Sequence, residues 1–265
     1  MSFKQFILTE GRSTALELDK AVAMYKKNCK NYRWNDQALY RGNRSSSAPM
    51  FIDPKKHERK SANTENYYTL WTDNSKKWSK YPNRSQSIIC TSRRQYALGY
   101  GEAFIVIPFD GATIGICSED DWWQSFSKSL QNFPRTVMSM GGFMKELQQA
   151  VANLLGKTPA DARKIMSKDY NSLVKTLKKG DKKFKEDAEW SERATLDMYK
   201  VIDYYDGFMN MMEYVLDPKN NGFKVIPFDK YSMDNFPNNE IWTDSPCLMI
   251  DPGEEVFDEF RKRVT

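Results

Sequence analysis

The sequence predicts a protein of the α+β class, because strand character and helical character occupy different parts of the chain. Strand patterns dominate residues 38–117 and 223–250, whereas residues 119–222 contain several helical patterns. Of the 265 residues, 40% are hydrophobic, with 15 Phe, 14 Tyr and 7 Trp, which is enough for a substantial core. We therefore expect a strand-rich domain of residues 1–118 and 223–265, with residues 119–222 as a large helical insertion.

The first elements are expected to be a helix and a short strand. Residues 13–30 carry apolar side chains on one helical face, and Ser13 or Thr14 can cap the start of that helix. Residues 38–42 predict a strand that ends in glycine. Residues 43–66 are rich in Ser, Asn, Lys and Arg and contain two prolines, which predicts an exposed loop.

Three further strands are expected before the helical block, at residues 87–91, 104–108 and 111–117, with a helix at residues 93–100. The block itself has helical patterns at residues 143–155, 159–179 and 188–216. Strands then return, and a helix closes the chain: residues 223–229, 240–242 and 247–250, then 254–263.

A pentapeptide recurs in the two strand-rich parts. Val-Ile-Pro-Phe-Asp occurs at residues 106–110 and again at residues 225–229. One recurrence is too little for a repeat protein. It indicates two similar strand ends that lead into loops.

The charge is mildly positive and unevenly distributed. The net charge is +5, and residues 157–185 contain ten Lys and Arg against three Asp. The lysines are densest at Lys175–Lys185, and this stretch has two interpretations. It is either a solvated helix face, which is common, or a surface that contacts the phosphates of RNA or DNA.

Cysteine and histidine usage argues against a metal site. The four cysteines have no close spacing and the only histidine is His57, so we expect no metal. The first residues lack a signal-peptide pattern, and no apolar run approaches the ~20 residues that span a bilayer. We therefore expect a cytoplasmic protein with reduced thiols and no membrane partner.

Three short segments beside predicted strands carry the candidate chemistry. Tyr40-Arg41-Gly42 supplies a guanidinium, which matches phosphate oxygens, next to a glycine that opens the backbone to a ligand. Thr91-Ser92 supplies hydroxyls at a strand end, and Glu240 supplies a carboxylate. Each segment alone also fits an ordinary role: a surface arginine, a helix cap or a solvated glutamate.

Together the three segments resemble the Arg–Ser–Glu class of mono-ADP-ribosyltransferases, which cleave NAD at the nicotinamide bond. That family has an aromatic-Arg strand, a Ser-Thr-Ser strand followed by a helix, and a Glu-x-Glu or Gln-x-Glu loop. Cys90-Thr91-Ser92 with the following Tyr96-Ala97 has this layout. The resemblance covers residues 35–117 and 223–250, and it implies two small, mainly antiparallel sheets around an NAD cleft.

The resemblance also implies roles for individual residues, with NAD as co-substrate. Glu240 is expected to be the catalytic carboxylate, assisted by Arg41. The residues expected to bind NAD are Tyr40, Arg41, Gly42, Thr91, Ser92, Tyr96 and Tyr100.

Two departures from the family pattern bear on the acceptor. Cys90 stands at the first serine, so its hydrogen bond to the glutamate is expected to be weak or absent. Asn238 stands at the first glutamate of Glu-x-Glu, so arginine is not the expected acceptor. The loop of residues 229–239 corresponds to the family's substrate-recognition loop. Its Tyr231 and Phe236 either contact an acceptor or anchor the loop to the core.

Several functions remain open at this level. The favoured one is transfer of ADP-ribose to a nucleic acid (RNA or DNA) or a protein. The alternatives are an NAD glycohydrolase that depletes NAD and a catalytically dead interaction module. The resemblance further suggests a bacterial toxin or a phage effector acting in the bacterial cytoplasm, with a neutralising antitoxin as a possible partner of the helical insertion.

Overall fold

The computed structural model describes four stretches of the chain: residues 13–44, 48–56, 65–186 and 197–265. By its internal contacts the chain divides into two compact units. The first unit draws on three stretches: Met1–Ala62, Lys80–Asp121 and Phe223–Thr265. The second unit draws on two: Asn63–Ser79 and Trp122–Gly222. The helical unit thus takes in residues 63–79, which lie outside the insertion expected at residues 119–222.

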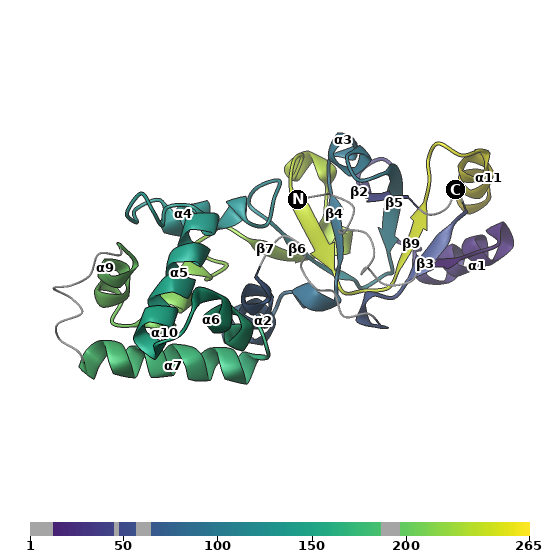
Figure 1. Cartoon of the computed structure of the whole chain (residues 1–265). Coiled ribbons are helices and arrows are strands. Elements are labelled where there is room, and N and C mark those ends of the chain that lie inside the picture. The colour runs from purple at the N-terminus through teal and green to yellow at the C-terminus, as the bar shows by residue number, and fades with distance from the viewer. Residues whose placement is uncertain (1–12, 45–47, 57–64, 187–196) are drawn as a thin grey trace. The chain divides into compact units, whose positions relative to one another are not determined.

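The first unit is built on one antiparallel sheet, most of whose strands are labelled in Figure 1. Within the described residues the nine strands run in the order β1-β3-β9-β5-β2-β4-β8-β6-β7. Their bounds are β1 Thr14–Ala15, β2 Leu39–Asn43, β3 Met50–Ile52, β4 Ile88–Thr91, β5 Glu102–Pro108, β6 Thr113–Ile116, β7 Lys224–Pro227, β8 Glu240–Thr243 and β9 Cys247–Ile250.

The mixed helix and strand content agrees with the predicted class, but the two small sheets expected from the resemblance are joined into one. The join is narrow, because β2 and β4 share a single residue pair, Tyr40 with Thr91. On one side of it, β2 pairs with β5 along five residues. On the other side, β4 pairs with β8 along four. A local sequence pattern does not specify such long-range pairing.

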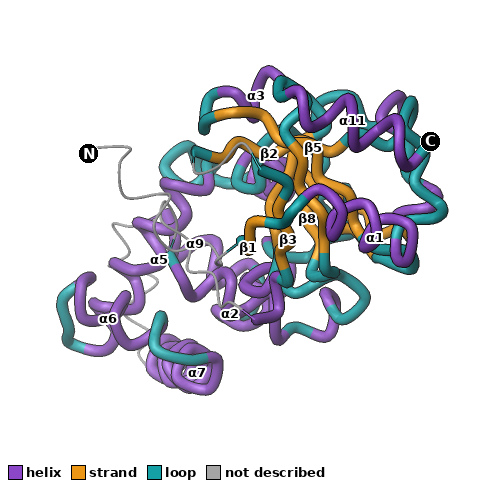
Figure 2. The backbone as a smooth tube through the Cα atoms, turned by 90° about the vertical axis from the view of Figure 1, so that its right-hand side faces the viewer, coloured by secondary structure: helices purple, strands orange, loops and turns teal. Residues whose placement is uncertain are grey.

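Helices complete the core of this unit. They are α1 Leu18–Asn28, α3 Arg94–Leu98 and α11 Glu255–Val264. α1 packs against α11 beside the sheet, whose strands are orange in Figure 2. Ala21, Val22 and Tyr25 of α1 are buried with Phe257 and Phe260 of α11. α3 packs on β2 and β5.

Two expectations for the N-terminal part were wrong. The helix expected at residues 13–30 begins only at Leu18, because Thr14 and Ala15 form β1. The loop expected at residues 43–66 contains β3, which pairs with both β1 and β9. These strands are too short to show an alternating pattern and depend on partners far away in the sequence.

The second unit is helical. Its helices are α2 Asn66–Asn74, α4 Ser127–Leu130, α5 Met140–Leu155, α6 Pro159–Met166, α7 Tyr170–Glu186, α9 Asp197–Tyr204 and α10 Phe208–Val215. The helix expected at residues 159–179 is split into α6 and α7, because Asp169 accepts a hydrogen bond from the Ser172 amide and starts α7.

The helix expected at residues 188–216 is also interrupted. It breaks between α9 and α10, where Asp206 and Gly207 have φ angles of 54° and 124°. Residues 188–196 of that expected helix lie outside the described residues. α2 had no counterpart among the expected elements.

Candidate functional site

The three segments singled out in the sequence lie on three neighbouring strands. β2, β4 and β8 are consecutive in the sheet. Tyr40 of β2 is opposite Thr91 of β4, and Thr91 is opposite Glu240 of β8. One row across the sheet therefore brings together residues that are about 50 and 150 positions apart in the chain.

Arg41 reaches from β2 to the adjacent strand. Its side chain is half-buried, and Nη1 donates a hydrogen bond to the Ile89 carbonyl oxygen of β4. Burial raises the pKa of the neighbouring Cys90 thiol to about 12; Arg41 opposes this shift and Glu240 adds to it. Both charged side chains therefore lie within electrostatic range of the same thiol. A guanidinium is the side-chain cation whose donors match phosphate oxygens two at a time.

Glu240 is the first residue of β8 and its carboxylate is paired. Arg84 Nη2 forms an ion pair with Glu240 Oε1, and only 8% and 15% of the two side chains are exposed. Cys117 Sγ lies 3.9 Å from the same oxygen. No sequence pattern pointed to Arg84, because Asn83-Arg84-Ser85 belongs to no recognisable motif.

Arg84 is held by the aromatic side chain two residues beyond Glu240. Its guanidinium carbon lies 5.3 Å from the ring centroid of Trp242, which points to the same face of β8 as Glu240. Trp242 Nε1 donates to the Pro82 carbonyl oxygen at 2.9 Å. The indole packs where Gly115 has no side chain, since a Cβ there would lie 2.2 Å from the ring.

The hydroxyls at the end of β4 act on the main chain around Glu240. Ser92 Oγ accepts a hydrogen bond from the Asn239 amide at 2.9 Å, and the Ser92 amide donates to the Asn239 carbonyl oxygen at 3.1 Å. Thr91 Oγ1 accepts from the Arg93 amide at 3.1 Å, just before α3 begins. Ser92 thus fixes the residue before Glu240, rather than the carboxylate itself.

One tyrosine of α3 and another just beyond its end lie at the surface near this row. Tyr96 and Tyr100 are 36% and 45% exposed. Burial of part of its ring raises the pKa of Tyr100, and the charges of Glu240 and Asp121 raise it further. Gly42 serves the packing of this helix, because a Cβ there would lie 2.2 Å from the Ala97 carbonyl oxygen. The space that was expected to admit a ligand at Gly42 is therefore filled by α3.

The loop that precedes β8 is anchored by an aromatic stack. Tyr231 is fully buried and lies between Phe228 and Phe236, with ring centroids 5.9 and 6.0 Å away. Tyr231 therefore has the anchoring role, the second of the two alternatives. Phe236 is half-buried beneath Lys224, whose Nζ lies 4.9 Å from the ring centroid. Asn238 is exposed.

Two polar side chains clamp the same loop, and sequence reasoning missed both. Arg33 donates to the carbonyl oxygens of Asp229 and Tyr231 at 2.6 and 2.8 Å. Gln37 is fully buried and donates to the Phe228 carbonyl oxygen at 2.7 Å. The carbonyl oxygens of Phe228, Asp229 and Tyr231 are thus fixed by side chains from another part of the chain.

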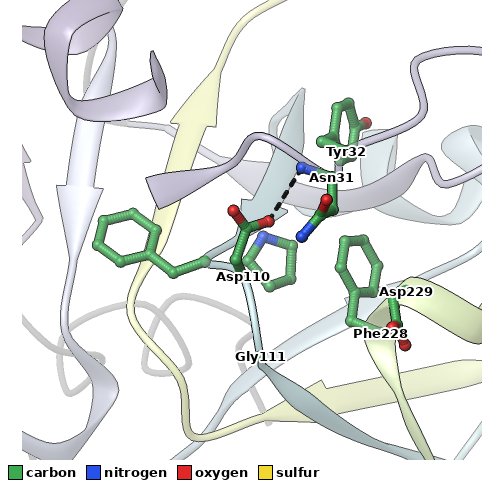
Figure 3. A pocket seen from close by; sticks show the side chains of 8 residues that line it. Asn31, Tyr32, Asp110, Gly111, Phe228 and Asp229 are labelled. Carbon is green, nitrogen blue, oxygen red and sulfur yellow. Dashed lines mark hydrogen bonds between the residues drawn. The ribbon is translucent and has the colours of Figure 1, made fainter. Parts of the chain in front are cut away.

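A small hollow of the first unit lies where the two copies of the recurring pentapeptide meet (Figure 3). Phe109 and Asp110 come from one copy, and Phe228 and Asp229 from the other. The Asp110 carboxylate accepts hydrogen bonds from two successive main-chain amides beyond α1, at 2.9 and 3.1 Å. Arg41 and Glu240 are not among the residues that line this hollow.

The four cysteines are free thiols and buried. Among the residues that the structure describes, no group of three or more His, Cys, Asp or Glu is arranged to hold a metal ion. Within the same residues, no helix has the length and apolar character needed to cross a membrane. Comparison with protein-family models gives no match, and neither curated proteins nor solved structures match the chain significantly.

Proposed function

We propose that the protein is an NAD-dependent mono-ADP-ribosyltransferase that transfers ADP-ribose to a macromolecule. The observation that carries this proposal is the adjacency of β2, β4 and β8, the strands that hold the arginine, hydroxyl and glutamate segments. Nine strands can be arranged in a sheet in many orders that would not place these three side by side. Segments that resemble one family's motifs and also meet in one row are hard to explain as unrelated surface features.

In this proposal the residues divide the work by chemistry. The guanidinium of Arg41 binds the pyrophosphate of NAD, because its planar set of N–H donors matches phosphate oxygens. The exposed rings of Tyr96 and Tyr100 offer faces for the nicotinamide. The bond between nicotinamide and ribose C1′ breaks, and its electron pair leaves with nicotinamide. Glu240 stabilises the positive ribose until an acceptor nucleophile forms the new bond to C1′.

Arg84 has a positioning role in the same scheme. Its ion pair occupies Oε1 of Glu240. The ion pair thereby holds the carboxylate that a ribose hydroxyl approaches in this proposal. A carboxylate with a fixed position needs little reorganisation when charge develops on the ribose.

The test is label transfer from NAD to components of a bacterial lysate. We expect Glu240→Gln to lower labelling by about 100-fold or more, because a neutral amide cannot stabilise the positive ribose. The matched control is Glu259→Gln, which makes the same change at an exposed position of α11. Equal labelling by wild type and Glu240→Gln would contradict the assignment of Glu240 as the catalytic carboxylate.

A second candidate, NAD hydrolysis, is favoured by Asn238. The amide of this exposed residue cannot act as a base toward an acceptor. Hydrolysis predicts free ADP-ribose in step with nicotinamide release and no labelled macromolecule. Transfer predicts labelled product, and its loss on nuclease or on protease treatment identifies the acceptor class. If the folded protein neither transfers nor hydrolyses NAD, the third alternative, a catalytically dead interaction module, is favoured.

A cellular role as a bacterial toxin or phage effector belongs to the same proposal. Expression in bacteria is then expected to arrest growth in wild type and not in Glu240→Gln. A neutralising antitoxin, if one exists, would be recovered as a suppressor of that arrest.

A further inference from the structure

The positive charge of the protein is concentrated in one part of the second unit. Residues 157–185 hold ten of the 40 Lys and Arg and three of the 35 Asp and Glu. The remainder of the chain therefore has 30 basic and 32 acidic residues, so it is close to neutral. Any surface of strong positive potential is expected at α6 and α7.

The lysines of α7 lie on the side of the helix that faces away from its neighbours. α7 packs against α5, α6 and α10 (Figure 1). Leu173, Thr176, Leu177 and Gly180 are buried on that packing side. At about 100° per residue, the lysines fall in an opposite arc of about 160°. All six are exposed: Lys175, Lys178, Lys179, Lys182, Lys183 and Lys185.

Within the stretches that the structure describes, most of this charge has no acidic partner. Lys182 pairs with Glu186 at 3.6 Å and Lys185 with Asp206 at 2.8 Å. The other four lysines have no ion pair among the described residues. Asp181, one of the two acidic residues of α7, is turned inward, where its carboxylate accepts a hydrogen bond from the Phe208 amide.

α6 and the segments beside it extend the basic surface. Lys157, Arg163, Lys164 and Lys168 are all exposed. Arg163 lies 3.5 Å from Glu65. We name α6, α7 and these flanking lysines the basic face of the second unit.

We propose that the basic face binds the phosphate backbone of double-stranded nucleic acid. Its only aromatic residues, Tyr170 and Phe184, are half-buried and contact Trp71 and Tyr199, so they offer no free rings for base stacking. A surface that binds by charge alone favours the ligand with the densest charge, and a duplex carries about one charge per 1.7 Å. The α7 lysines extend over about 15 Å, along several phosphates.

The interaction does not depend on the proposed NAD chemistry and is measured without NAD. Fluorescence anisotropy with short labelled DNA duplexes, RNA duplexes and matching single strands gives the affinity at several salt concentrations. The test variant replaces Lys175, Lys178, Lys179 and Lys183 by Gln. The matched control replaces four exposed lysines of the first unit by Gln, so that both variants lose the same charge: Lys20, Lys26, Lys27 and Lys30.

We expect the α7 variant to bind duplexes at least tenfold more weakly at low salt. Its slope of log affinity against log salt should fall by about 2 to 4, since each lost phosphate contact contributes about 0.9. The control should keep most of the affinity, and Arg at the same four α7 positions should restore binding. Equal binding by wild type and the α7 variant, or an equal loss in the control, overturns the proposal. Binding of single strands as tight as that of duplexes overturns the assignment to duplexes, and the DNA and RNA arms show which duplex is preferred.

Discussion

The row across β2, β4 and β8 and the basic face of α6 and α7 use charge in opposite ways. In the row, Glu240 is mostly buried, paired with Arg84 and fixed through Asn239 by Ser92. On the basic face, four lysines of α7 are exposed and have no ion pair among the described residues. A carboxylate in a fixed geometry suits chemistry on a small ligand, whereas many mobile cations suit a long polyanion.

The comparison predicts that substitutions in the row cost stability and that substitutions on the basic face cost only binding. The largest expected effect is at Arg84. Arg84→Met keeps an apolar stem against Trp242 but removes the cation that pairs with Glu240 Oε1, so we expect a loss of about 3 kcal/mol in the free energy of unfolding. Urea denaturation measures this loss. Because the cost arises from a mostly buried carboxylate that has lost the Arg84 cation, Glu240→Gln in the same chain should recover at least half.

Gly42 tests whether α3 must approach β2 as closely as the structure has it. A Cβ at residue 42 would lie 2.2 Å from the Ala97 carbonyl oxygen, so Gly42→Ala should lose about 2 to 3 kcal/mol. Thermal unfolding gives the change. Gly141→Ala is the control, since no atom lies within 4 Å of its Cβ position. A similar small effect for both would mean that α3 shifts without cost.

Gln37 tests the clamp on the loop before β8. Gln37→Leu leaves the Phe228 carbonyl oxygen and the Arg33 amide without their partner, which should cost about 1 to 2 kcal/mol. Amide hydrogen exchange should speed up in residues 228–236 more than elsewhere. The exposed Gln95→Leu serves as the control. Unchanged exchange in that loop would show that the aromatic stack alone holds it.

Cys90, the residue before Thr91 in β4, makes the stability of this region depend on pH. Its pKa is raised from 9.0 to about 12 in the folded protein, chiefly by burial, so folding favours the protonated thiol. The contribution of the protonated thiol to the free energy of unfolding is intact below pH 9. It is lost, by about 1.4 kcal/mol per pH unit, as the pH rises from 9 toward 12. The variant Cys90→Ala has no thiol at this position and therefore lacks this pH-dependent contribution. The difference in unfolding free energy between the two proteins should therefore narrow from pH 8 to pH 10.5, and a constant difference would contradict the assignment.

The smallest effect is expected on the basic face. Replacing Lys175, Lys178, Lys179 and Lys183 by Gln should change the free energy of unfolding by no more than about 0.5 kcal/mol, because exposed side chains without partners contribute little. Urea denaturation of the variant that is used for the binding measurement provides the value. A loss comparable to that of Arg84→Met would erase the contrast between the two regions.

Much of the helical structure was predictable because helical hydrogen bonds are local. The expected helix at residues 143–155 lies within α5, and α11 departs by one residue at each end from the helix expected at residues 254–263. The predictions failed where a helix was interrupted. Asp169 starts α7, and Gly207 separates α9 from α10. Both breaks come from short-range backbone signals that interrupt the helix although the apolar pattern continues across them.

The candidate site was predictable only in part. Arg41, Thr91, Ser92 and Glu240 stood out because each follows a recognisable motif. Arg84 and Gln37 did not, since neither belongs to a motif and each acquires its role from a partner more than 150 residues away. The burial of Tyr231 was likewise undecided, because an aromatic in a loop fits either an anchor or a contact surface.

The sequence by itself determined the helical faces, the concentration of lysines at residues 157–185 and the three segments that resemble a known family. Only the tertiary structure decided that β2, β4 and β8 are neighbours, that a single residue pair joins the two parts of the sheet and that Arg84 pairs with Glu240. The physical reason is the range of the interactions. A helix satisfies its hydrogen bonds within four residues, whereas a strand needs partners that no local pattern names.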